Sequence, residues 1–221
     1  MPLALITGAA RANSLAAAIG QRLIRDGWNV ANSDLSGTNH NVDLSTAGGP
    51  DYLIDQVVRD CGPIDALILS HAHEIESGIL DTTAESFDKH MAVNARASLL
   101  LIAAFARQIS GMGGSIVALT SDHTTGNLPY GASKGALDRL VLSAARELGP
   151  LQISANVLNP GPVDTGWMDA DTRQVLTPRH PLGRLGEPSD IAALVAFLVS
   201  PAGRWISGQL LHSDGGFSAH Y

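Results

Sequence analysis

Residues 3–34 read LALITGAARANSLAAAIGQRLIRDGWNVANSD, and this stretch decides the fold class. Leu3–Thr7 is a short apolar run that predicts a buried strand. Leu15–Arg25 then shows helical spacing and is followed by Gly27, which is typical of a helix end. Trp28–Ser33 is predicted as a second strand. The stretch therefore predicts two parallel strands joined by a crossover helix.

The rest of the chain repeats this alternation without a linker or a low-complexity segment. The further predicted strands are Ala66–Leu69, Ser115–Leu119, Gln152–Leu158 and Gln209–Leu211, and the further helices are Asp51–Asp60, Thr83–Ile109, Tyr130–Leu148 and Pro188–Val199. Because the strands are apolar throughout, we expect a parallel sheet covered by helices on both faces. The prediction is a single α/β domain over residues 1–221, doubly wound, with about seven parallel strands.

Composition and charge exclude several classes of function. An apolar content of 45% and 23 glycines suit a compact α/β protein. The net charge of −7 offers no basic surface for nucleic acid or anionic lipid. Cys61 is the single cysteine, so we expect a reducing compartment, the cytoplasm. The first residues, MPLALITGAA, predict neither a signal peptide nor a membrane span.

The turn after the first strand, TGAARANSLA at residues 7–16, is a candidate phosphate-binding loop. Such a turn brings backbone N–H groups and the positive end of a helix onto a phosphate. Only Gly8 remains of the usual three glycines, so an ordinary tight turn is the alternative interpretation.

Asp34 supports the phosphate-loop interpretation. It closes the second strand 20 residues after Ser14, the offset of an acid that accepts hydrogen bonds from an adenosine ribose. A carboxylate here would also repel a 2′-phosphate, which favours NAD over NADP. The alternative for Asp34 is a solvated acid at a strand end.

The stretch YGASK, residues 130–134, places a phenol and an ammonium group on one face of a helix. A tyrosine with a pKa near ~10 is a poor acid–base catalyst at neutral pH, and a nearby cation lowers that value. Ser121 lies nine residues before Tyr130, just past a strand, and could hydrogen-bond the same reacting oxygen. The alternatives are a surface Tyr130–Lys134 pair and a turn serine.

With these residues and four later stretches, the chain resembles the short-chain dehydrogenase/reductase (SDR) family over essentially its whole length. The later stretches are NVLNPGPVDT (156–165), PLGRLGEP (181–188), SGQ (207–209) and HSDGG (212–216). The last three most resemble 3-oxoacyl-acyl-carrier-protein reductases and related NAD-dependent alcohol dehydrogenases. The resemblance implies a Rossmann fold, hydride transfer between NAD(H) and a small or acyl carbonyl/alcohol substrate, and a homodimer or homotetramer built through the two long helices.

The resemblance also implies a role for each catalytic candidate. Ser121 would polarise the substrate carbonyl, and Tyr130 would give or take the proton. Lys134 would lower the pKa of Tyr130 and hold the nicotinamide ribose. Asn94 would support a water relay to the lysine; the alternative is a polar residue on a helix face.

The implied cofactor is NAD, with NADP as the second choice. Pro160, Gly161 and Val163 match the turn beside the nicotinamide, and Thr165 matches a contact to its carboxamide or to the pyrophosphate. The full set of implied cofactor-binding residues is Gly8, Arg11, Asn13, Ser14, Leu15, Asp34, Asp43, Leu44, Ser70, His71, Ala72, Tyr130, Lys134, Pro160, Gly161, Val163 and Thr165.

Two motifs depart from the family pattern. The T-G-x-x-x-G-x-G loop has become Thr7-Gly8 followed by Ala12 and Ser14, which resembles enoyl-acyl-carrier-protein reductases. The hydroxyl of Ser14 could serve as a phosphate donor. The family's N-N-A-G reads LSHA at residues 69–72, which alters one wall of the nucleotide site.

A helix that the family normally has is expected to be missing. Asp34 and Asp43 are only nine residues apart, and about five extended residues span at most ~18 Å, which recrosses the sheet without forming a helix. We therefore expect a more open adenine side, with Asp43 still beside the adenine.

Two other segments are short, which predicts an accessible substrate cleft. The connection from Ser121 to Tyr130 is about four residues shorter than is usual in the family. Asp164–His180 forms a brief substrate loop. Within it, Trp167 and Met168 could face the substrate, with a packed loop anchor as the alternative.

Three other functions are alternatives to an oxidoreductase. The stretch His71-Ala72-His73-Glu74, with Asp122 and His123, could suggest a zinc hydrolase. No known ligand spacing is complete, however, and we expect polar cleft walls and no metal. A nucleotide-binding regulator without turnover would not need the serine, tyrosine and lysine together. Dehalogenating relatives typically replace the lysine with arginine, whereas Lys134 is retained.

Overall fold

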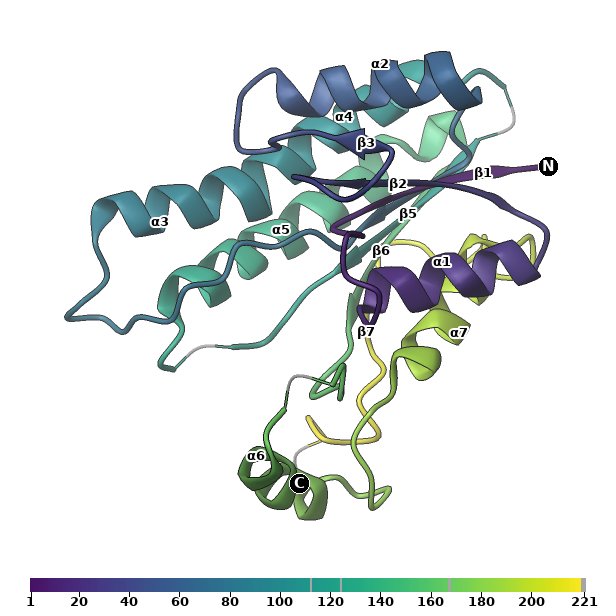
Figure 1. Ribbon diagram of the computed structural model, residues 1–221. Coiled ribbons are helices and arrows are strands. Elements are labelled where there is room, and N and C mark those ends of the chain that lie inside the picture. Colours follow the sequence, from purple (N-terminus) through teal and green to yellow (C-terminus); the bar gives the residue numbers. More distant parts are fainter. Residues whose placement is uncertain (112, 124, 167, 220–221) are drawn as a thin grey trace.

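The computed structural model describes residues 1–111, 113–123, 125–166 and 168–219 (Figure 1). Its centre is a seven-stranded parallel sheet in the order β3-β2-β1-β4-β5-β6-β7. The strands are β1 (Leu3–Thr7), β2 (Asn29–Asp34), β3 (His40–Asn41), β4 (Ala66–Leu69), β5 (Gly114–Leu119), β6 (Ile153–Asn159) and β7 (Leu210–His212). Strand order reverses between β1 and β4, which places a ligand crevice at their carboxyl ends.

Helices cover both faces of this sheet (Figure 1). The helices are α1 (Leu15–Arg25), α2 (Gly49–Cys61), α3 (Ala84–His90), α4 (Ala97–Gln108), α5 (Leu128–Glu147), α6 (Ala170–Leu176) and α7 (Pro188–Val199), with a π-helical turn, Met91–Arg96, between α3 and α4. One hydrophobic core packs α2, α4 and α5 against the sheet, and a second packs α1 and α7 against the opposite face.

Strand β1 shows why the sheet is buried on both sides. Leu3 and Leu5 belong to the core under α2, α4 and α5, whereas Ala4 and Ile6 belong to the core under α1 and α7. Successive side chains of a strand point to opposite faces, so a strand between two helical layers must be apolar at every position. The predicted doubly wound α/β class is confirmed.

The connection between β2 and β3 has no helix, as predicted. Residues 35–39 form bends, and His40 pairs directly with Ser33 of β2. The next backbone contact, from Val42 N–H to the Asp34 carbonyl, brings Asp43 back to the same sheet edge.

Two segments differ from the sequence prediction. The expected single helix Thr83–Ile109 is interrupted by the π-helical turn, which contains the buried Asn94. The substrate loop contains a short helix, α6, whose N-cap Asp169 accepts a hydrogen bond from Thr172 N at 2.7 Å. Among the described residues, no helix has the length and apolar character needed to cross a membrane.

Candidate active site

A cavity of about 580 Å³ opens at the carboxyl ends of β1, β2 and β4. Its wall is formed by Gly8, Ala10, Arg11, Asp34, Leu35, Val42, Asp43, Leu44, Ser45, Ser70, His71, Ala72, His73, Glu74, Lys89 and Val93. The glycine turn, the acid at the end of β2 and the segment after β4 thus meet in one cavity. Its size and donor groups fit a dinucleotide.

A glycine is required at position 8 because the turn after β1 and the segment after β4 approach each other closely. Its φ is +73°, and a Cβ there would lie 2.7 Å from the Cα of His71. Any side chain would therefore push the glycine turn away from the segment after β4. Gly8 keeps the floor of the cavity narrow, even though the other family glycines are absent.

Ser14 has a structural role that differs from its predicted one. It is the N-cap of α1: its Oγ accepts from Ala17 N at 3.1 Å and donates to the Arg11 carbonyl at 2.7 Å. The hydroxyl hydrogen that we expected on a phosphate is therefore used inside the turn. Backbone groups of the turn and the start of α1 are left as the groups that could bind a phosphate, with Asn13 and Leu15 flanking the N-cap.

Backbone N–H groups hold Asp34 and Asp43, the two acids of the predicted adenine side, in place. Asp34 accepts from Ala10 N at 2.9 Å and from Leu35 N at 2.7 Å. Asp43 accepts from Ser45 N at 2.8 Å, and hydrogen bonds from Ser45 lower the pKa of Asp43. Lys89 of α3 reaches Ser45 Oγ at 2.8 Å and so narrows the side where the β2–β3 helix is missing.

His71 connects three elements and remains neutral. Its Nε2–H donates to the Val93 carbonyl at 3.1 Å, which leaves Nδ1 to accept from the Thr7 hydroxyl at 2.7 Å. Burial, followed by the charge of Lys134, lowers the pKa of His71 to about 4. With both ring nitrogens engaged, His71 is unsuited to ligate a metal. No three metal-ligating side chains cluster within the described parts of the chain.

Tyr130 and Lys134 lie one turn apart at the start of α5, as the sequence predicts. Lys134 is buried, and its Nζ lies 5.7 Å from the centre of the Tyr130 ring and donates to the Leu119 carbonyl at 2.8 Å. Burial lowers the pKa of Lys134 to about 8. Lys134 is thereby fixed between α5 and the end of β5.

Ser121 faces the same region from the segment after β5. Its Oγ accepts from His123 N at 3.3 Å, and the His123 ring stands edge-on to the Tyr130 ring, 6.3 Å away. His123 thus links the serine to the tyrosine. Asp122 and His123 are both exposed.

The predicted direction of the Tyr130 pKa shift is not found. Burial raises the pKa of Tyr130 above that of a free phenol, and the carboxylate of Glu74 raises it further. The lowering expected from Lys134 is not found, and burial raises the pKa of Tyr130 because a phenolate loses its hydration when buried.

The structure gives the protein partners of the Asn94 side chain, and the water relay that the family resemblance implies stays a prediction. Its Oδ1 accepts from His73 N at 2.7 Å, while Nδ2 donates to the His73 carbonyl at 2.9 Å and to Ser133 Oγ at 2.8 Å. The buried amide therefore holds the segment after β4 against α5. This is a positioning role for Asn94.

The turn after β6 approaches the C-terminal segment closely. Gly161 has a φ of +59°, and a Cβ there would lie 2.5 Å from the Cβ of Asp214. Its N–H donates to Asn159 Oδ1 at 3.0 Å, and Val163 bridges to Gly186. Pro160 and Thr165 belong to this same turn, which does not line the cavity, and their contacts with a cofactor stay a prediction. Trp167 lies outside the described residues.

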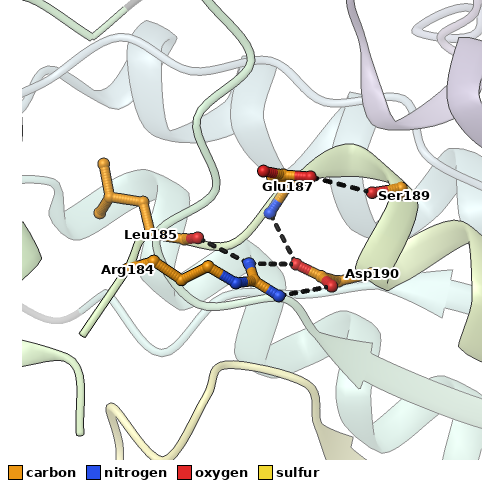
Figure 2. A network of polar contacts seen from close by, with 5 residues as sticks. All are labelled: Arg184, Leu185, Glu187, Ser189 and Asp190. Carbon is orange, nitrogen blue, oxygen red and sulfur yellow. Dashed lines mark hydrogen bonds and ion pairs between the residues drawn. The ribbon is translucent and has the colours of Figure 1, made fainter. Parts of the chain in front are cut away.

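Figure 2 shows how the far end of the substrate loop is fastened. Arg184 donates to both carboxylate oxygens of Asp190, at 2.7 and 2.9 Å, and to the Leu185 carbonyl at 2.9 Å. Asp190 also accepts from Glu187 N at 2.8 Å, which caps α7. The PLGRLGEP stretch is thus an anchor for the loop rather than a source of reacting groups.

Sequence reasoning used Glu74 only as part of a metal-like cluster and did not consider Asn127. Glu74 lines the cavity and accepts a hydrogen bond from Asn127 Nδ2 at 2.8 Å, across 53 positions of sequence. Nothing in the local order of residues indicates this pair, because it forms only once the segment after β4 packs on α5.

Known proteins resemble this chain throughout its length. Residues 8–218 match the family model described as enoyl-(acyl carrier protein) reductase. The uncharacterized oxidoreductase YjdA of Bacillus subtilis (strain 168) is 35% identical over 241 residues, spanning 97% of this chain and 96% of the relative.

Two solved structures share the fold. A blue fluorescent protein from a metagenomic library, in complex with NADPH, has a TM-score of 0.88 and 30% identity, covering 99% of this chain and 98% of its own. The angucycline C-6 ketoreductase LanV, with bound NADP, has a TM-score of 0.87 and 28% identity, covering 98% of this chain and 95% of its own.

Proposed function

The chain belongs to the short-chain dehydrogenase/reductase family, and we propose that it acts, as one domain, to interconvert a carbonyl and an alcohol with NAD(H) as the hydride carrier. One observation carries the proposal: Tyr130 and the buried Lys134 share one face of α5, and their charges interact with Glu74 and His71, which line a cavity suited to a dinucleotide. The nicotinamide would supply or accept the hydride.

Each side chain has a proposed part in the proton chemistry. The Ser121 hydroxyl would hydrogen-bond the substrate oxygen, and the Tyr130 hydroxyl would exchange a proton with it. Lys134 would hold the nicotinamide ribose. Its Nζ has one bond to the Leu119 carbonyl, and an ammonium group carries three hydrogens.

NAD(H) is proposed over NADP(H) because of Asp34. Its carboxylate lines the cavity where β2 ends, and a 2′-phosphate brought near it would meet like charge. Relatives of the same fold are solved with NADPH and NADP, so the family accepts the phosphorylated cofactor as well. The proposal therefore rests on this chain's own acid.

The substrate is proposed to be a small or acyl carbonyl compound, taken up from the cytoplasm by a homodimer or homotetramer. The surface formed by the π-helical turn, α4 and α5 has a hollow in which apolar side chains such as Met91 and Leu99 lie beside charged ones such as Arg139, and this mixed lining is where a second copy is proposed to pack. A regulator without turnover is not favoured, because the Ser121–Tyr130–Lys134 set is intact.

A screen of cofactor oxidation tests the proposal. NADH and NADPH are each offered with ketones, 3-oxoacyl thioesters, quinones and sugar-derived carbonyls, and the alcohol product is identified by mass spectrometry. We expect NADH-dependent reduction of at least one class. Binding of neither cofactor and turnover of no class would reject the function.

A further inference from the structure

The end of the cavity beside β2 and β3 has apolar walls. Leu35, Val42 and Leu44 line it from the segments that follow these two strands, and Val93 lines it from the π-helical turn. Apolar walls suit the faces of a flat heteroaromatic ring, whereas the hydrogen-bonding groups of such a ring lie on its edge. The polar side chains next to these walls therefore decide which ring edge the cavity accepts.

Two opposite charges, Asp43 and Lys89, line this end of the cavity and are joined through Ser45. Lys89 Nζ donates to Ser45 Oγ at 2.8 Å, and the Ser45 N–H donates to Asp43 Oδ1 at 2.8 Å. Hydrogen bonds from Ser45 lower the pKa of Asp43, and the charge of Lys89 adds to this lowering. The cavity wall thus places a carboxylate, which only accepts hydrogen bonds, near an ammonium group, which only donates them.

The position of the Lys89 side chain is not that of an ordinary helix-surface lysine. Glu85 lies four residues earlier on α3, the spacing at which helical ion pairs form. Within the described residues, Lys89 forms no ion pair with Glu85 and instead reaches Ser45, 44 positions away in the sequence. Holding an exposed lysine in one place costs side-chain entropy, so this placement at the cavity wall suggests a ligand there.

The loop that Lys89 reaches is also held by other side chains. Arg96 Nη2 donates to the Ser45 carbonyl at 2.6 Å. Thr46 Oγ1 donates to the Asp43 carbonyl at 2.9 Å and accepts from Gly49 N at 3.1 Å. Lys89 is therefore not required to fix the backbone of the loop. Among the described contacts, its Nζ makes one hydrogen bond, and an ammonium group carries three hydrogens.

We propose that Lys89 recognises the adenine of the cofactor, by donating a hydrogen bond to a ring nitrogen next to the amino group that Asp43 accepts from. Adenine carries an amino donor beside ring-nitrogen acceptors, which matches a carboxylate near an ammonium group. Since no helix joins β2 to β3, α3 supplies this side of the base site instead. The inference rests on the proposed function, because it concerns the adenine of the proposed cofactor.

Lys89→Met is the informative variant, because methionine keeps much of the volume of the stem and removes the ammonium group. Arg107→Met is the matched control. It also removes one exposed cation, which pairs with Asp51 and is not among the described residues that line the cavity. Cofactor fluorescence gives the Kd for NADH and for reduced nicotinamide mononucleotide, which has the nicotinamide but no adenosine. Thermal unfolding checks that each variant is folded.

In Lys89→Met, we expect the Kd for NADH to rise about tenfold, as for the loss of a hydrogen bond from a charged donor. The Kd for the mononucleotide should stay within about twofold of the wild-type value, and Arg107→Met should match the wild type for both ligands. An unchanged Kd for NADH in Lys89→Met would overturn the inference. So would an equal weakening of both ligands, because Lys89 would then not act on the adenine.

Ser45→Ala separates direct contact with the base from support of the loop. We expect this variant to raise the Kd for NADH by no more than about threefold, since Arg96 still holds the backbone and Lys89 still lines the cavity. Equal weakening by Ser45→Ala and Lys89→Met would mean that Lys89 acts only through Ser45, which also overturns the inference. A wild type that does not bind NADH would instead reject the proposed function.

Discussion

At the scale of single residues, burial and the charge of Lys134 keep the imidazole of His71 neutral in the folded protein. Its ring nitrogens are bound to Thr7 and Val93, and its pKa is lowered from 6.5 to about 4, first by burial and then by Lys134. Between these two pH values, the unfolded chain binds a proton that the folded chain does not. The free energy of unfolding must therefore decrease as the pH falls through this window.

His71→Asn should remove this acid sensitivity. Between pH 7 and pH 4, protonation of His71 is expected to lower the free energy of unfolding of the wild type by about 3 kcal/mol. The free energy of unfolding of the variant should lack this part of the decrease. Urea unfolding at both pH values measures the difference. His123→Asn, at an exposed side chain, is the control. Parallel losses in the wild type and His71→Asn would mean that His71 does not carry the effect.

Asp34 is expected to set the choice of cofactor through its charge. Asp34→Asn keeps an oxygen for the Ala10 N–H and removes the charge that would face a 2′-phosphate. The preference for NADH over NADPH should narrow by roughly tenfold, measured as the ratio of dissociation constants by cofactor fluorescence.

Asp43→Asn serves as the control for cofactor choice. It removes a charge from the same cavity wall and should affect both cofactors alike. Equal binding of NADH and NADPH by the wild type would contradict the assignment.

At the scale of elements, the contact between the turn after β1 and the segment after β4 depends on Gly8. Gly8→Ala brings a Cβ to 2.7 Å from backbone atoms of His71, in addition to the cost of a positive φ. Gly27→Ala carries a positive φ with no atom within 4 Å, so it measures the backbone cost alone, about 1–2 kcal/mol.

We expect Gly8→Ala to destabilise the protein more than Gly27→Ala and to weaken NADH binding severalfold. Urea unfolding and cofactor fluorescence measure the two effects. Equal destabilisation by both variants, with NADH binding unchanged, would show that the close approach at Gly8 is dispensable.

The elements differ in how far sequence could predict them. β1, α1, β4 and α7 begin and end where their apolar periodicity does, because each is bounded by a glycine, a cap or a proline. The absence of a helix between β2 and β3 was predictable because the connecting segment is too short to contain one. The π-helical turn at Asn94 was not predictable, since one extra residue in a turn leaves the apolar spacing nearly intact.

At the scale of the whole molecule, sequence motifs indicated the proposed catalytic side chains but not the charges around them. Tyr130 and Lys134 are neighbours in the chain, so helical geometry alone brings them together. Glu74 is held beside the start of α5 by Asn127, while Asn94 and His90 bind the backbone on either side of Glu74, and these contacts exist only in the folded protein. The direction of the Tyr130 pKa shift was mispredicted for this reason, and because burial cannot be read from a motif.

The central claim is that Tyr130 handles the proton of a nicotinamide-dependent reduction, and the kinetics of Tyr130→Phe test it most directly. The variant keeps the ring and its packing while removing the exchangeable proton. With a carbonyl found in the cofactor screen, kcat should fall by a factor of about 100 or more, while the Kd for NADH stays within about twofold of the wild-type value. Turnover by Tyr130→Phe at the wild-type rate would contradict the account.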